Sequence, residues 1–355
     1  MARDLKLGLN IGYWGGGPPS GGRESILEAE RLGFDSVWTA EAYGSDALVP
    51  LAWWGASTER IKLGTGIVQI SARTPAATAM AAMTLDHLSG GRLILGLGVS
   101  GPQVVEGWYG QPFAKPLARM REYIGILRDV WGRQGPGTND GPHYPLPLPD
   151  GTELGKPLKS SIHPLREDIP IYLAAEGPKN IAMAAELCDG WLAIFYSPQH
   201  EELYREPLAE GFERRPWDED AAGSGAGGWP EKFEVAATVP LIVTDDPHAA
   251  IDAVRPMYAL YFGGMGARSA NFHANVPIRM GYEAEVKRIQ ELYLDGKKEE
   301  AAAAVPQELI EQLTLIGPAD KIRHDLEAWR ESSVTTLLIG GDSQTLRAAA
   351  EVVLG

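Results

Sequence analysis

The feature of this sequence that most constrains its fold is an alternation of short apolar runs with longer amphipathic segments. Eight apolar runs are candidate strands, at residues 5–11, 36–39, 61–70, 93–97, 169–173, 190–194, 233–243 and 335–339. Helical patterns lie between them, at residues 24–32, 47–56, 75–88, 118–134, 180–187, 200–212, 248–261 and 319–332, and at 343–353. Short apolar runs suit strands that are buried on both faces, and strands that alternate with helices predict a parallel sheet of βαβ units.

Eight such units predict one closed (β/α)8 TIM barrel rather than a doubly wound sheet, because eight strands close a barrel and no second domain signature remains. A chain of 355 residues is long enough for two domains or for one such barrel. We therefore expect a single α/β barrel domain over residues 1–355. Three segments interrupt its rhythm: a proline-rich loop at 135–168, a glycine-rich link at 216–230 and a helical insertion at 262–318. We expect the first and third to emerge at the C-terminal face of the barrel, where active sites lie.

Charge and cysteine content exclude several classes of function. The chain has 47 acidic and 32 basic residues, a net charge of −15, which argues against nucleic acid and anionic membranes as partners. Its single cysteine, Cys188, can form neither an internal disulfide nor a multi-thiolate metal site, and no signal peptide is recognisable, so we expect a cytoplasmic protein. The seven histidines lack the spacing of metal ligands on one helix face, so no metal is expected.

Two glycine-rich turns are candidate ligand sites. Residues 96–101 (GLGVSG) match G-x-G-x-x-G, but Pro102 follows instead of an immediate helix and the strand is the fourth, not the first. We therefore interpret these glycines as small residues that let the backbone approach a flat or anionic group. We do not favour the alternative, a dinucleotide-binding fingerprint. Residues 174–180 offer a helix N-terminus to an anion, with an ordinary turn as the alternative. After the last strand, Asp342 predicts a simple N-cap.

Glu41 directly follows the second apolar run, and a carboxylate at the C-terminal end of a barrel strand is typical of a catalytic group. A salt-bridged rim residue is the alternative. Three aromatic residues would line the same rim: Tyr13, Trp14 and Tyr43. The alternative is that their side chains only pack against the rest of the protein. Ser100 misses the nucleophile-elbow pattern by one glycine, which argues against a serine hydrolase.

Residues 85–98 (LDHLSGGRLILGLG) form a recognisable motif. Five further motifs are spread over most of the chain: LGFDSVW at 32–38, KLGTGI at 62–67, RTP at 73–75, AAEGP at 174–178 and DGW at 189–191. On these motifs the chain resembles the luciferase-like monooxygenase superfamily and, within it, the branch that uses the deazaflavin coenzyme F420.

The resemblance implies a ring lying across the mouth of the barrel, against a bulge in the third strand that holds a non-prolyl cis peptide. The matching bond here is Gly66-Ile67, with Ile67 under the ring. Glu41 matches an acidic residue near the polar edge of the ring. The residues that match cofactor-binding positions are Glu41, Gly66, Ile67, Val99, Ser100, Gly101, Ala174, Ala175, Glu176, Gly177 and Pro178. Cations that could meet the anionic tail are Arg73, Lys179, Arg255 and Arg268.

Relatives that oxidise sugar phosphates place a histidine and a glutamate where this chain holds Ala42 and Gly101. The base for oxidising a hydroxyl is therefore missing, and we favour reduction of a small carbonyl, imine or activated alkene, with the proton from Tyr13, Glu41 or water. An FMN-dependent monooxygenase and a relative that binds cofactor without turnover remain as alternatives. Family habit implies a homodimer.

Overall fold

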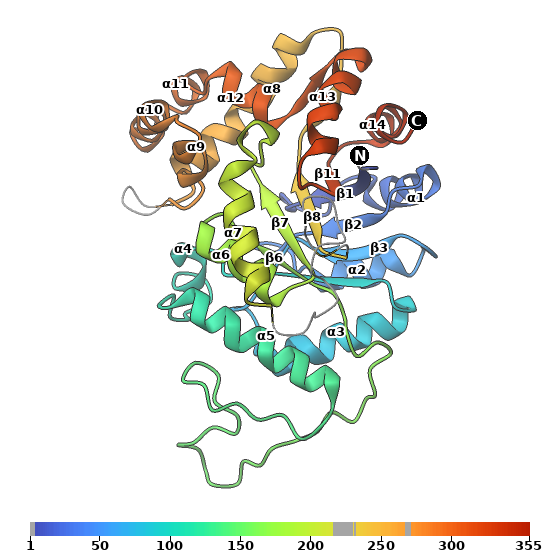
Figure 1. Ribbon diagram of the computed structural model, residues 1–355, viewed down its shortest axis with the longest axis vertical. Helices are drawn as coiled ribbons and strands as arrows, with labels where there is room; N and C mark the ends of the chain where they lie inside the picture. The colour runs from blue at the N-terminus through green and yellow to red at the C-terminus, as the bar shows by residue number, and fades with distance from the viewer. Residues whose placement is uncertain (1–3, 216–229, 231, 267–270) are drawn as a thin grey trace.

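The computed structural model describes residues 4–215, 230, 232–266 and 271–355, and its centre is a closed barrel of parallel strands (Figure 1). The barrel strands are β1 (Lys6–Gly12), β2 (Ser36–Thr39), β3 (Lys62–Thr65), β5 (Leu93–Gly98), β6 (Ile171–Ala174), β7 (Gly190–Ile194), β8 (Glu234–Thr238) and β11 (Thr336–Ile339). Pairing of β1 with β11 and of β3 with β5 closes the ring, and the short β4 (Val68–Gln69) continues β3 beside β5. The predicted (β/α)8 barrel is confirmed.

Helices form the outer layer of the barrel in Figure 1. They are α1 (Gly22–Leu32), α2 (Leu48–Gly55), α3 (Pro75–Ser89), α5 (Pro116–Gly132), α6 (Pro178–Leu187), α7 (Glu202–Glu213), α13 (Ala319–Glu331) and α14 (Ser343–Val353). Helix α3 shows how the sequence sets such boundaries. Thr74 Oγ1 accepts from the Ala77 N–H at 3.3 Å, Pro75 opens the first turn, and Gly90 ends the helix at a φ of 69°.

Two apolar clusters build the core. Side chains that point into the barrel form the smaller one: Trp38, Ile94, Tyr172, Leu192, Ala236 and Leu338. The larger one lies between the strands and the helices. Close approach inside the barrel explains the glycine motif of β5: a Cβ on Gly96 would lie 1.7 Å from the Thr65 carbonyl oxygen, and one on Gly98 would lie 2.2 Å from Ile67 Cδ1. Gly96 and Gly98 therefore allow close packing between neighbouring strands, whereas the approach of a flat or anionic group to this backbone stays a prediction.

The segment 135–168 contains no helix or strand and hangs below α5 and α3 in Figure 1. Because it joins a helix to the next strand, both its ends lie at the amino-terminal end of the barrel, where Arg166 donates to the carbonyl of Leu93 at the start of β5 (2.8 Å). The expectation that it emerges at the C-terminal face is wrong for these ends. Only its middle reaches that face, where the Tyr144 N–H donates to Glu122 of α5 (3.1 Å).

The apolar run at 233–243 forms two strands instead of one, because Pro240 cannot donate to a ladder. After β8, strand β9 (Leu241–Val243) pairs with β10 (Leu315–Gly317), which the sequence analysis missed. Between these strands lie α8 (Pro247–Ala259), the π-helical turn η2 (Leu260–Gly264), α9 (Asn275–Arg279), α10 (Glu283–Leu294), α11 (Lys298–Ala303) and α12 (Gln307–Leu313). We call residues 239–318 the β8–α13 insertion. It joins a strand to a helix and so lies at the C-terminal face, as expected.

Two further expectations are not tested by the described residues. The predicted link at 216–230 falls outside the described residues, except for Pro230. The assignment of the chain to one domain stays a prediction. Among the described residues, Cys188 is buried and unpaired, and no helix has the length and apolarity needed to cross a membrane.

Candidate functional site

The residues singled out in the sequence lie where five barrel strands end. Tyr13 follows β1, Glu41 follows β2, Gly66 and Ile67 follow β3, residues 99–101 follow β5, and residues 174–178 end β6 and open α6. Because the strands are parallel, these ends meet at one end of the barrel. We call this end the mouth.

The floor of the mouth is apolar. Half-buried Ile67 and Ala174 pack on the cluster that fills the barrel interior. The cis peptide bond predicted between Gly66 and Ile67 is present, and Ser100 adopts a φ of 57° in the turn after β5. A flat apolar ring can rest on such a floor.

Glu41 is 5% exposed and held from several sides. Arg73 Nη1 donates to both carboxylate oxygens, at 2.9 and 2.8 Å, and the N–H groups of Gln69 and Ala47 approach at 3.2 and 3.4 Å. Arg73 also pairs with Asp46. The carboxylate is thus a fixed acceptor in an ion pair, the alternative raised from the sequence, and its part in catalysis stays a prediction.

Three polar side-chain atoms are buried at the mouth without a hydrogen-bond partner among the described residues: Gln69 Oε1, Ser71 Oγ and Asn180 Oδ1. Gln69 is the most informative, since it is 1% exposed and its Nε2 already donates to the carbonyls of Glu41 (3.0 Å) and Ala42 (2.9 Å). An orphaned buried acceptor costs free energy. These atoms fit a ligand that brings hydrogen-bond donors. A lone glutamine in the apolar run 67–70 was the sequence signal for this position.

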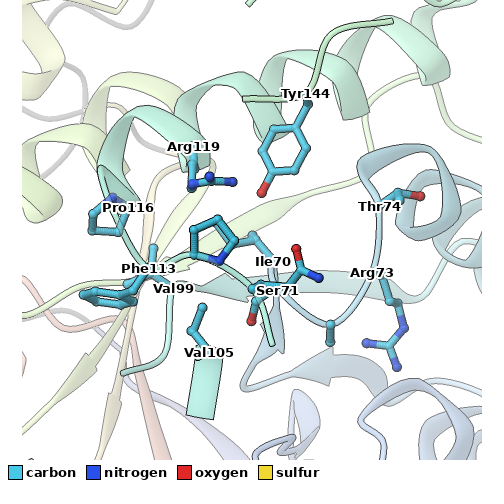
Figure 2. Close-up of a pocket in the computed structure, with 13 residues that line it drawn as sticks. Ile70, Ser71, Arg73, Thr74, Val99, Val105, Phe113, Pro116, Arg119 and Tyr144 are labelled. Carbon is cyan, nitrogen blue, oxygen red and sulfur yellow. The ribbon is translucent and has the colours of Figure 1, made fainter. Parts of the chain in front are cut away.

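A cavity of about 230 Å³ opens beside the mouth between β4, the turn after β5 and α5. Figure 2 shows Arg119 and the hydroxyl of Tyr144 directed into it, while the Arg73 guanidinium points away. Arg119 donates to the Ala114 carbonyl (3.1 Å), and no carboxylate of the described residues pairs with it. Burial raises the pKa of Tyr144, and the positive charge of Arg119, whose Cζ lies 5.9 Å from the centre of the Tyr144 ring, acts in the opposite direction. None of the lining residues is acidic, so the cavity suits an anion.

The start of α6 gives a second place for an anion. Gly177 is its N-cap, no side chain caps the helix, and a Cβ on Gly177 would meet nothing within 4 Å. Exposed Lys179 follows. At α14, in contrast, Asp342 accepts from the Thr345 N–H at 2.9 Å, which confirms the predicted N-cap.

Of the four cations expected at an anionic tail, one makes its contacts elsewhere in the fold and one lies outside the described residues. Arg255 pairs with Asp252, its neighbour on α8, and donates to the carbonyl of Val305. It therefore serves the packing of the β8–α13 insertion. Arg268 lies outside the described residues.

Tyr13 and Glu176 meet the β8–α13 insertion. The residue Tyr13 is 56% exposed, and the partial burial of its side chain raises the pKa of its hydroxyl, while the neighbouring Tyr261 acts in the opposite direction. The Glu176 carboxylate hydrogen-bonds to His273 Nδ1, and Arg279 Nη2 donates to the Glu176 carbonyl at 2.5 Å. Sequence reasoning treated His273 as a surface or core residue, because nothing local reveals a contact across 97 positions.

Comparisons with known proteins agree with this arrangement. A family model described as luciferase-like monooxygenase matches residues 12–336. A Mycobacterium tuberculosis protein whose name proposes a coenzyme F420-dependent oxidoreductase is 54% identical over 99% of this chain and 100% of its own length. The 5,10-methylenetetrahydromethanopterin reductase of Archaeoglobus fulgidus is 29% identical over 88% of this chain and 86% of its own. The solved F420-dependent tetrahydromethanopterin reductase of Methanopyrus kandleri shares the fold, with a TM-score of 0.78 at 22% identity over 99% of both chains.

Proposed function

The chain belongs to the luciferase-like monooxygenase family, and we propose that within it the protein is a coenzyme F420-dependent oxidoreductase that reduces a small organic substrate. The observation that carries this proposal is the 54% identity, over 99% of the chain, to a protein whose name proposes that activity. Among the described residues there is no group of three or more histidine, cysteine, aspartate or glutamate side chains that could hold a metal ion.

The residues at the mouth fit the cofactor. Ile67 and the apolar floor support a flat ring, and Gln69 Oε1 is an acceptor for a ring N–H. Arg119 and the open start of α6 offer positive potential to the phosphate and the acidic tail, against a net charge of −15. When bound, coenzyme F420 supplies the hydride chemistry; the protein binds, orients and excludes water.

Tyr13 is the proton donor that we propose for the substrate oxygen, nitrogen or carbon. A tyrosine hydroxyl is protonated at neutral pH, and Tyr13 lies at the mouth with 56% of its surface exposed. Glu41, in contrast, already accepts from Arg73 and two backbone N–H groups, so we assign it to ordering the cofactor side of the mouth. The substrate class is a carbonyl, an imine or an activated alkene.

Binding and turnover test this proposal separately. Apoprotein is titrated with F420, with its phosphate-free and tail-free deazaflavin core, and with FMN, and the ring fluorescence is followed. We expect F420 to bind more tightly than the bare core, and reduced F420 to be oxidised over part of a carbonyl, imine and alkene panel. Tight FMN binding with no deazaflavin response would favour the monooxygenase. Binding of F420 without turnover of any panel compound would favour the non-catalytic relative.

We also propose a homodimer, formed by an apolar face of α2 and α3. Val49 and Trp53 of α2 are 67% and 77% exposed, and Met80 and Leu88 of α3 are 57% and 76% exposed. No charged residue occurs in α2, and a second copy would cover the patch by two-fold pairing. Trp53→Glu should halve the mass in light scattering, whereas Leu294→Glu on α10 should not; a monomeric parent protein contradicts the proposal.

The cytoplasmic location stays a prediction from cysteine usage.

A further inference from the structure

The turn between β6 and α6, at residues 174–177, is fixed through its carbonyl groups. Three successive carbonyls each accept a hydrogen bond from a side chain. The pairs are the Ala174 carbonyl with Asn180 Nδ2 (3.3 Å), the Ala175 carbonyl with Trp191 Nε1 (2.8 Å) and the Glu176 carbonyl with Arg279 Nη2 (2.5 Å). The donors lie on α6, on β7 and on α9 of the β8–α13 insertion. Three separate elements therefore hold one short turn.

The N–H groups of the same turn have no such partners. Among the described residues, no group accepts a hydrogen bond from the backbone N–H of Glu176, Gly177 or Lys179. The peptide bonds that precede Glu176 and Gly177 are trans, so each N–H points away from the carbonyl of the same planar group. Donors that hold the carbonyls on one side of the turn thus direct its N–H groups to the other side, where an anion can accept from them.

Trp191 is deeply buried and held in one orientation. It is 2% exposed, and its ring meets the rings of Tyr196 and Tyr204 at 5.9 and 5.4 Å. Its indole N–H has one acceptor, the Ala175 carbonyl. Trp191 also closes the DGW motif at 189–191, to which the proposed function gives no role. The geometry gives it one: it links the start of β7 to the turn before α6.

Two residues of the insertion hold Glu176 from the other side. Arg279 donates to its carbonyl, and His273 Nδ1 hydrogen-bonds to its carboxylate. The side chains of Glu176 and His273 are 14% and 28% exposed, so this pair is partly shielded from solvent. A carboxylate so close to a helix start competes for the free N–H groups when nothing else binds it. His273 therefore leaves those groups to an anion from outside the chain.

We propose that Trp191, Arg279 and His273 are positioning residues for the phosphate of the cofactor. Trp191 and Arg279 hold the carbonyls of the turn so that its free N–H groups face the phosphate, and His273 keeps the Glu176 carboxylate away from them. This inference rests on the proposed function, in which the start of α6 meets an anionic group of coenzyme F420. The three residues act through the turn and need no contact with the cofactor.

The first test compares three ligands of the apoprotein by ring fluorescence: F420, its core carrying the phosphate without the tail, and the phosphate-free core. Trp191→Phe removes the indole N–H and keeps an aromatic ring. We expect the Kd of both phosphate-bearing ligands to rise about tenfold, and that of the phosphate-free core to stay within about twofold. Trp131→Phe is the matched control, because the buried Trp131 Nε1 donates to the Ala79 carbonyl at 3.2 Å; it should change none of the three.

The second test addresses the two residues of the insertion. Arg279→Gln should raise the Kd of F420 about fivefold, and Arg279→Lys, which keeps a charged donor, should raise it less. His273→Ala should also raise it about fivefold, and Glu176→Gln in the same chain should restore most of the affinity by removing the competing charge. Arg255→Gln is the control, because the Arg255 guanidinium also donates to a carbonyl of the insertion and should not affect F420.

Each outcome decides the proposal. Equal losses for F420 and the phosphate-free core would mean that these residues support the whole mouth, and a loss confined to F420 with its tail would assign the turn to the tail; both overturn it. Unchanged affinities in Trp191→Phe and Arg279→Gln do so as well. Circular dichroism checks the fold, and if Trp191→Phe does not fold, Arg279→Gln and the rescue of His273→Ala decide.

Failure of the proposed function gives a different result. If the parent protein binds FMN and not F420, the F420 assignment is wrong, and the same comparison made with FMN and riboflavin still tests the positioning residues. A Trp191→Phe variant that loses affinity for FMN alone would then support them. A parent protein that binds none of these compounds overturns both proposals.

Discussion

Asp86 and Glu41 are two buried carboxylates, each paired with an arginine, at opposite ends of the same barrel. Asp86 of α3 is fully buried near the amino-terminal end, where Arg166 Nε donates to it at 3.1 Å. Glu41 lies at the mouth and is paired with Arg73. The chemistry of the two pairs is alike, and their surroundings differ.

At the amino-terminal end, the Asp86 carboxylate is fully buried and the Arg166 side chain is 32% exposed. Arg166 belongs to the 135–168 segment, and it also donates to the carbonyl that opens β5. The pair at the mouth borders Gln69, whose buried Oε1 has no partner among the described residues. The pair of Asp86 and Arg166 therefore holds a loop in place at one end of the barrel. At the other end, the pair of Glu41 and Arg73 lies beside an unpaired acceptor to which a ligand can donate a hydrogen bond.

The largest difference that we expect between the two ends is the effect of a substitution on the stability of the fold. Arg166→Gln leaves the Asp86 charge buried without its partner, and we expect a loss of about 3–5 kcal/mol in the free energy of unfolding. Urea denaturation measures this loss. Lys321→Gln, which breaks an exposed pair on α13, should stay within about 0.5 kcal/mol. F420 affinity of folded Arg166→Gln should equal that of the parent; weakened binding would mean that the two ends are coupled.

At the mouth, the larger effect should be on turnover. Glu41→Gln keeps the side-chain size but removes the charge that orders Arg73, and we expect kcat to fall about a hundredfold with the fold intact. Steady-state kinetics and circular dichroism check the two parts of this prediction. Unchanged turnover would mean that Glu41, like Asp86, forms an ion pair with a structural role only. The two ends of the barrel would then not differ in function.

The smallest effect concerns the orphaned acceptor. Gln69→Leu removes the Oε1 that we assign to a ring N–H, and the Kd for F420 and for its phosphate-free core should both rise about tenfold. Fluorescence titration measures both values. The matched substitution Gln344→Leu, at an exposed residue of α14, should change neither. Loss of affinity for F420 alone would place Gln69 at the anionic tail instead of the ring.

Most of the fold was predictable because its determinants are local. The runs at 36–39 and 190–194 coincide with β2 and β7, and the pattern at 343–353 coincides with α14. Each depends on apolar periodicity and on boundary residues such as Asp342. The split at Pro240 and the three-residue β10 were missed, because so short a strand carries too few residues for a period.

The sequence by itself determined the barrel, the strand ends that form the mouth and the cis bond at Gly66, since parallel topology and family motifs place these along the chain. Only the tertiary structure decided what those residues do there. Glu41 pairs with Arg73 and accepts from the Gln69 N–H, and Glu176 hydrogen-bonds to His273; these contacts join positions 28 to 97 residues apart. Such contacts depend on how the barrel closes, and no local pattern encodes a partner that only closure brings within reach.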